Sequence, residues 1–244
     1  MPTNLPTSPG RTAVIGSGVA GLTAAYLLSR RDAVTLYERE PRLGGHAHTH
    51  TVPAGSPMAG PVRVDTGFIV HNDRTYPYLG RLFRELGIRV RDTEMSMSIR
   101  DEVSGLEYAG GRGLAGFVAR PRQLASPRYL SLLTQVRRFH RLASAFLASA
   151  ATPGEPLTYG EFLAEARFSP DFIELYAVPV VSCVWSTGRA DALGYPARYL
   201  FAFLDHHGML SIGNSPTWRT VVGGSATYVE AVAARVHEVR TGVG

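Results

Sequence analysis

The sequence predicts an α/β protein with a parallel sheet and a mostly helical insert, and three observations support this prediction. Apolar runs at 13–15 and 33–37 flank a helical pattern from about residue 19 to residue 29. Beyond a glycine-rich stretch at 110–113, the composition becomes helical. A glycine pair, a helical pattern and a strand-like run then return at 223–243. Strands that alternate with helices are typical of a parallel sheet.

The turn after the first strand reads Gly-Ser-Gly-Val-Ala-Gly, which follows the pattern G-x-G-x-x-G. Gly16 permits the tight turn, Gly18 lets a pyrophosphate approach the backbone, and Gly21 lets the helix pack closely on the sheet. The helix N-terminus presents free N–H groups and a positive dipole end to phosphates. In this strand–turn–helix context, the pattern predicts a Rossmann-type dinucleotide site, with an ordinary glycine-rich turn as the alternative.

The second strand is followed by an acid, Glu38, which lies 22 residues after Gly16. A carboxylate at this place can accept hydrogen bonds from an adenosine ribose. It would also repel a 2′-phosphate, so NADP is not the nucleotide we expect.

The segment Arg42-Leu43-Gly44-Gly45 follows closely and reads R-x-G-G. With the glycine-rich turn and Glu38, it resembles the FAD-binding fingerprint of the glutathione-reductase-type flavoproteins. The similarity is greatest to the branch with flavin amine oxidases, phytoene desaturases and protoporphyrinogen oxidase. The resemblance implies FAD as the cofactor, bound with its pyrophosphate and ribose over Arg42, Gly44 and Gly45. It further implies hydride transfer from an organic substrate to flavin N5.

A third segment, Asp65-Thr66-Gly67, resembles the family position where the backbone passes the flavin ring, although an ordinary β-turn has the same composition. His46 and the segment 218–229 resemble those of amine-oxidase-like bacterial NAD/FAD-binding proteins. The complete set of expected cofactor residues is Gly16, Ser17, Gly18, Val19, Ala20, Gly21, Glu38, Arg39, Arg42, Gly44, Gly45, His46, Thr66 and Gly67.

Two features of the family are missing from the sequence. Members continue through a further substrate sheet and return to the flavin with a C-terminal segment, whereas this chain ends at Gly244. The lysine that amine oxidases of this branch place near flavin N5 is also absent, because every basic residue here is arginine. We therefore expect the N-terminal part of a complete enzyme, and the residues indicate no catalytic acid or base.

Composition and charge exclude several other classes of protein. The net charge is +5, but the arginines are scattered and no basic run alternates with aromatic residues, which argues against nucleic acid as a partner. A single cysteine, Cys183, excludes an intrachain disulfide, and its apolar surroundings predict a buried thiol. No apolar run reaches 18 residues, and residues 1–10 lack the features of a signal peptide, so we expect a cytoplasmic protein.

Two further patterns have simple explanations. His46, His48 and His50 alternate and would share one face of an extended segment, but no carboxylate or cysteine is near enough in sequence to complete a metal site. We expect no bound metal. The amphipathic, arginine-rich helix predicted at 130–150 fits a weak contact with an anionic membrane surface, although a helix whose arginines face water is the better explanation.

These observations lead to three hypotheses about function. In each, the partner is a small molecule, and the residues do not indicate an oligomeric state. The first is an FAD-dependent oxidoreductase whose aromatic-rich insert suits an apolar substrate. The second is an NAD-dependent dehydrogenase, and the third is a non-catalytic nucleotide-binding piece. The predicted organisation is a disordered leader (1–10), the first part of the cofactor domain (11–110), a helical substrate insert (111–215) and a return to the cofactor domain (216–244).

Overall fold

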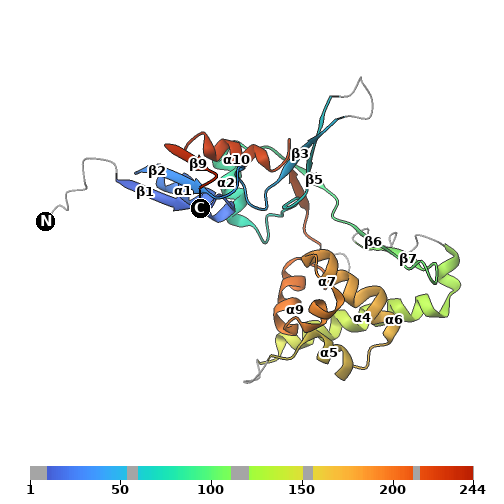
Figure 1. Cartoon of the computed structure of the whole chain (residues 1–244). Helices are drawn as coiled ribbons and strands as arrows, with labels where there is room; N and C mark the ends of the chain where they lie inside the picture. Colours follow the sequence, from blue (N-terminus) through green and yellow to red (C-terminus); the bar gives the residue numbers. More distant parts are fainter. Residues whose placement is uncertain (1–9, 54–59, 111–120, 151–155, 211–214, 244) are drawn as a thin grey trace. The chain divides into compact units, whose positions relative to one another are not determined.

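The computed structural model in Figure 1 divides the chain into two compact units. The first unit comprises residues 1–93 and 217–244, and the second unit comprises residues 94–216. The residues that the structure describes are 10–53, 60–110, 121–150, 156–210 and 215–243.

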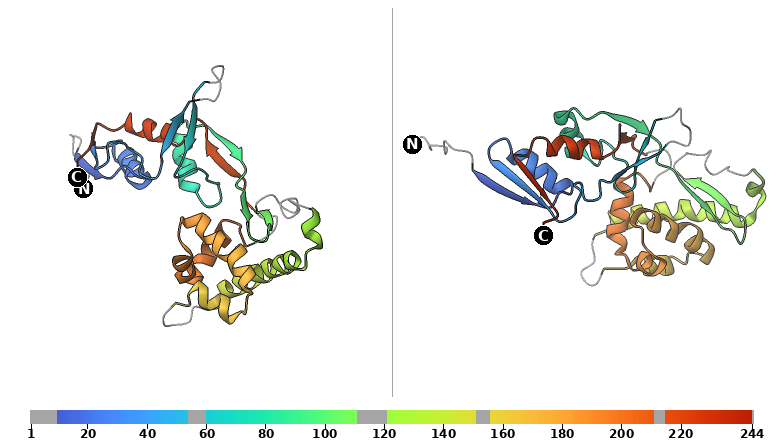
Figure 2. Two further views of the ribbon diagram at one scale, coloured as in Figure 1. Left: turned by 45° about the vertical axis from the view of Figure 1, so that its right-hand side comes forward. Right: turned by 45° about the horizontal axis from the view of Figure 1, so that its top comes forward.

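A three-stranded parallel sheet forms the centre of the first unit, with the strand order β1-β2-β9. Its strands are β1 (Arg11–Ile15), β2 (Ala33–Glu38) and β9 (Glu238–Thr241). The helices α1 (Val19–Leu28) and α10 (Ala226–Ala233) contact each other, and α1 also contacts β1 and β2. Figure 2 shows β9, from the end of the chain, beside β2 from its beginning. The predicted parallel sheet is confirmed.

The burial of alternate residues explains why these strands form. Val14, Val34 and Leu36 are buried in the core of the first unit, where they join Leu22 and Ala25 of α1. Successive side chains of a strand point to opposite faces, so the neighbours of these residues point away from that core.

In its described residues, the rest of the first unit has two antiparallel strand pairs and one helix. The helix α2 (Pro77–Leu86) ends at Gly87, which has a left-handed backbone conformation. The pairs are β3 (Thr49–Val52) with β4 (Val62–Asp65), and β5 (Val90–Thr93) with β8 (Trp218–Val221).

The second unit is mostly helical and has an aromatic core. Phe139 of the long helix α4 (Pro127–Ala148) lies at the centre of this core and is 1% exposed. The ring contacts of Phe139 include Tyr159, Phe162, Phe168, Phe172, Tyr176 and Phe201. The elements are β6 (Met97–Arg100) paired with β7 (Glu107–Gly110), η1 (Pro121–Ala125), α4 (Pro127–Ala148), α5 (Tyr159–Glu165), α6 (Pro170–Phe172), the π-helix η2 (Ile173–Ala177), α7 (Val178–Trp185), α8 (Arg189–Gly194) and α9 (Ala197–His206).

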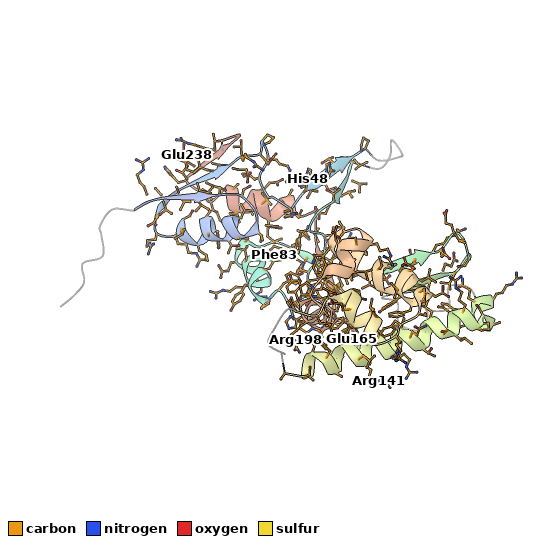
Figure 3. All side chains as sticks on the ribbon, turned by 60° about the horizontal axis from the view of Figure 1, so that its bottom comes forward. His48, Phe83, Arg141, Glu165, Arg198 and Glu238 are labelled. Carbon is orange, nitrogen blue, oxygen red and sulfur yellow. The ribbon has the colours of Figure 1, made fainter. Side chains whose placement is uncertain are left out.

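The arginines of α4 have different environments. Arg138 lies 4.7 Å from the ring centroid of Phe168, and Arg128, near the start of the helix, pairs with Asp171. Arg141 is exposed on α4 (Figure 3). Contact of this helix with a membrane surface stays a prediction.

Two features differ from the sequence-based expectations. The division between units falls after Thr93 rather than near Gly110, because Leu106 and Tyr108 are buried in the aromatic core of the second unit. The assignment of cofactor and substrate roles to these parts stays a prediction. Cys183, expected to be buried, is exposed. It lies in a helix that buries Val180 and Val181, and an apolar run in a helix does not bury every residue.

Candidate functional site

The glycine-rich turn lies at the carboxyl end of β1, and each of its glycines has a distinct environment. Gly16 has a φ of +88°, which favours glycine. A Cβ at position 21 would lie 1.9 Å from the carbonyl oxygen of Gly16, so the helix can approach the strand only with glycine there. A Cβ at Gly18 would have no described atom within 4 Å, so its backbone faces open space. This is the arrangement that the phosphate-binding pattern predicts.

The N-terminus of α1 completes this part of the site. Gly18 is the residue before the helix, and no side-chain hydrogen bond caps the helix among the described residues. Val19 and Ala20 form the exposed first turn. The first N–H groups of a helix have no partner within it, so the turn offers donors and a positive dipole end to an anion.

Glu38 lies at the end of β2, beside the turn. Its Oε1 accepts a hydrogen bond from the backbone N–H of Glu40 at 2.9 Å, and its Oε2 accepts one from the backbone N–H of Ser17 at 2.8 Å. The Ser17 hydroxyl donates a further bond to Oε2. Hydrogen bonds lower the pKa of Glu38 to about 2. The bond from the Glu40 N–H has the largest effect, and the bonds from the Ser17 hydroxyl and N–H come next. The carboxylate is therefore ionised at neutral pH.

The R-x-G-G segment packs directly against the turn. The backbone N–H of Gly44 donates to the carbonyl oxygen of Ser17 at 3.1 Å and to its hydroxyl oxygen at 3.0 Å. A Cβ at Gly45 would lie 3.0 Å from the Cα of Gly18. The structure thus brings the turn, Glu38 and the glycine pair together, although Glu38 and Gly44 lie 21 and 27 residues after Ser17 in the sequence.

The two arginines of this region have different roles. The Arg42 guanidinium donates to the carbonyl oxygens of Gly45 at 2.8 Å and Ala47 at 3.3 Å, so it holds its own loop closed. The side chain of Arg39 is 82% exposed and pairs with Glu40. Phosphate binding by either arginine stays a prediction.

The third predicted segment is connected to the second through backbone hydrogen bonds. The N–H of Thr66 donates to the carbonyl of His48 at 3.0 Å, and the N–H of Phe68 donates to that of His46 at 2.9 Å. Gly67 lies between these two bonds. Residues 66 and 67 therefore belong to the same part of the first unit as the R-x-G-G segment.

A cluster at the N-terminus of α10 could not be found from the sequence. Asp65 accepts hydrogen bonds from the backbone N–H of Ser225 at 2.9 Å and from its hydroxyl at 2.8 Å, and Thr49 donates a third bond to the same carboxylate. Gly224 packs so closely that a Cβ there would lie 2.5 Å from a methyl group of Thr49. The only sequence signal was the glycine pair at 223–224, and it did not indicate the partners.

The alternating histidines and one described cavity are two further features of the first unit. The rings of His48 and His50 lie 4.0 Å apart, but among the described residues no group of three metal-binding side chains comes together. A cavity of about 360 Å³ lies near Asp32 and His237, which precede β2 and β9. Ligands of open parallel sheets bind at the carboxyl ends of the strands. This cavity lies at the amino ends of β2 and β9, so it is not the nucleotide site that we expect.

Comparison with known proteins first defines the class of the first unit. Residues 14–86 match the family model of the NAD(P)-binding Rossmann-like domain. This range contains the turn, Glu38, the R-x-G-G segment and Gly67.

One curated relative matches over a short stretch, and solved structures match over nearly the whole chain. A stretch of 34 residues is 65% identical to the carotenoid phi-ring synthase of Streptomyces griseus and covers 14% of this chain and 7% of that protein. The cyclohexylamine oxidase of Brevibacterium oxydans is 18% identical with a TM-score of 0.66, over 96% of this chain and 51% of its own. The fatty acid isomerase of P. acnes is 20% identical with a TM-score of 0.61, over 96% of this chain and 52% of its own.

These likenesses confirm the predicted fold, a Rossmann-type nucleotide-binding sheet with a helical insert. The chain spans about half the length of the solved structures that it matches. No helix in the described ranges is long and apolar enough to cross a membrane.

Proposed function

We propose that the chain binds FAD and forms the cofactor-binding part of an oxidoreductase of the amine-oxidase or desaturase type. The observation that carries this proposal is the convergence of the glycine-rich turn, Glu38 and the segment Arg42–Gly45 at the carboxyl ends of β1 and β2. An NAD-dependent dehydrogenase shares the first two features but does not explain the third.

The residues of the first unit fit the adenosine and pyrophosphate parts of FAD. Gly18 leaves open space beside uncapped helix N–H groups, which suits a pyrophosphate. Glu38 is ionised, so it would accept hydrogen bonds from the ribose hydroxyls and repel a 2′-phosphate. Thr66 and Gly67 would lie nearer the flavin ring. When bound, FAD supplies the group that accepts a hydride, while the chain binds and orients the cofactor.

The substrate is proposed to be a small organic molecule. The names of the matched proteins include an amine oxidase, a fatty acid isomerase and a carotenoid-modifying synthase, so both amines and apolar molecules are candidates. The aromatic rings that suggested an apolar substrate pack largely in the core of the second unit, where Phe139, Phe172 and Phe201 are at most 1% exposed. They therefore support the fold more than a choice of substrate. A cytoplasmic location remains part of the proposal.

The absorbance spectrum of the purified protein tests the choice of cofactor. We expect a flavin spectrum, or tight binding when FAD is added, and weaker binding in Glu38→Ala because ribose hydrogen bonds of about 1 kcal/mol each are lost. Glu102→Ala, which changes an exposed glutamate of the second unit, is the control. A protein that binds NAD and ignores FAD would contradict the proposal.

A second candidate, a nucleotide-binding piece without its own activity, is favoured by the half-length match to the solved structures. Turnover of amines and fatty acids with artificial electron acceptors distinguishes the two. FAD binding without reduction by any of these substrates would favour the non-catalytic piece.

A further inference from the structure

We propose that Ser17 is a positioning residue, which fixes Glu38 and Gly44 on the glycine-rich turn without touching the cofactor itself. This inference deepens the proposed function and rests on it for its effect on FAD. In the fingerprint G-x-G-x-x-G, residue 17 is the first variable position, so the pattern alone assigns it no role.

The contacts of Ser17 connect three separate segments. Its backbone N–H donates to Oε2 of Glu38 at 2.8 Å, and its hydroxyl donates to the same oxygen at 2.5 Å. The N–H of Gly44 donates to the hydroxyl oxygen of Ser17 at 3.0 Å and to its carbonyl oxygen at 3.1 Å. One residue therefore joins the turn to the end of β2 and to the R-x-G-G segment.

The hydroxyl of Ser17 both donates and accepts a hydrogen bond with these two partners. A serine hydroxyl has a single proton, which goes to Glu38, while one of its lone pairs accepts the N–H of Gly44. The residue is 0% exposed, so its side chain cannot reach a ligand in solvent. Any effect of this hydroxyl on the cofactor must pass through Glu38 or Gly44.

The direction of the Glu38 carboxylate is the property that Ser17 sets. Two donors of Ser17 hold Oε2, and the N–H of Glu40 holds Oε1, so the carboxylate has a defined orientation. Carboxylate oxygens have further lone pairs, which remain for ribose hydroxyls. Hydrogen bonds to a carboxylate favour its charged form, so the same contacts keep Glu38 ionised.

Charged groups around Glu38 are mostly paired with one another. Arg39, which follows Glu38 directly, pairs with Glu40. On the adjacent strand β9, Arg240 pairs with Glu238, and Thr241 lies opposite Glu38. Hydrogen bonds therefore determine the protonation state of the Glu38 carboxylate, and those from Ser17 are among the bonds that lower its pKa most.

Ser17→Ala tests the inference, because it removes the hydroxyl and keeps both backbone hydrogen bonds. Thr12→Ala is a matched control: the Thr12 hydroxyl donates to the Asp32 carboxylate at 2.7 Å across the same pair of strands, at their opposite end. Two quantities are measured, the dissociation constant of FAD at pH 7 and the pKa of Glu38 from its side-chain ¹³C shift without FAD. Ser17→Cys, which keeps a weak donor of similar size, repeats both measurements if the alanine variant does not fold.

We expect Ser17→Ala to weaken FAD binding about tenfold, as expected for the loss of one hydrogen bond to a charged group. The pKa of Glu38 should rise from about 2 toward the ordinary value of a glutamate, and Thr12→Ala should change neither quantity. An unchanged pKa of Glu38 in the Ser17 variants would overturn the inference. Unchanged FAD affinity, in a chain whose wild type binds FAD, would overturn it too. If the wild type does not bind FAD, the proposed function fails, and the pKa alone then decides the role of Ser17.

Discussion

Gly67 packs against the carbonyl oxygen of His46 so closely that a Cβ at position 67 would lie 2.0 Å from it. The backbone N–H of Phe68 donates to the same oxygen at 2.9 Å. A contact of this kind involves two backbones, so no side chain can move aside to relieve it. The glycine of the Asp65-Thr66-Gly67 turn is therefore required by packing, whatever it does toward a cofactor.

Gly67→Ala should lower the free energy of unfolding by about 2 kcal/mol or more, because the added methyl group forces the backbone at 66–68 away from His46. Urea unfolding measures this change. Gly60→Ala is the matched control, since a Cβ at Gly60 would have no described atom within 4 Å and its φ is not in the left-handed region. Equal stabilities of the two variants would show that the close approach to His46 is not maintained in solution.

Substitutions of Gly18 and Gly21 should affect different properties, FAD binding in the first case and folding in the second. A Cβ at Gly18 enters open space, so Gly18→Ala should change the free energy of unfolding by less than about 1 kcal/mol while it obstructs the pyrophosphate. Gly21→Ala should prevent native folding, because its Cβ would lie 1.9 Å from the carbonyl oxygen of Gly16. Circular dichroism and FAD titration check both. A folded Gly18→Ala variant with wild-type FAD affinity would show that Gly18 does not line the FAD site.

The parts of the site that the sequence predicted are those with local signals. The turn at 16–21 follows from rules about a few adjacent residues, and it is present. The hydrogen bonds of Asp65 to Ser225 join residues 160 positions apart, and such pairs leave no trace in one sequence. Cys183 was misjudged for a related reason. Burial depends on which face of a helix packs against the core, and the apolar run around Cys183 did not show its period.

Val14 and Ile15 are neighbours on β1 with opposite environments. Val14 is 8% exposed and packs in the core of the first unit, while Ile15 is 79% exposed. Val14→Ala should therefore cost about 2 kcal/mol of stability through lost burial and a small cavity, and Ile15→Ala should cost less than about 0.5 kcal/mol. Urea unfolding of the two variants measures the difference. Similar losses would mean that Ile15 is covered in solution.

His140 and Tyr176 should make the stability of the second unit depend on pH. The Nε2 atom of His140 lies 2.9 Å from the Tyr176 hydroxyl, and burial lowers the pKa of His140 to about 4. The unfolded chain binds the proton with a pKa of about 6.5, so it gains protons before the folded chain does. The contribution of neutral His140 to the free energy of unfolding is complete above pH 6.5 and is lost as the pH falls toward 4. At pH 5 the loss should be about 2 kcal/mol relative to pH 7.

His140→Gln isolates this effect, because glutamine can bond to Tyr176 but does not titrate. His71 has a pKa lowered by burial as well, so it contributes a slope of the same sign in both proteins. Urea unfolding at pH 7 and pH 5, followed by circular dichroism, gives the two free-energy differences to compare. We expect the wild type to lose about 2 kcal/mol more than His140→Gln between these pH values. Equal losses in the two proteins would mean that His140 titrates normally, and hence that water reaches the His140–Tyr176 pair in the folded state.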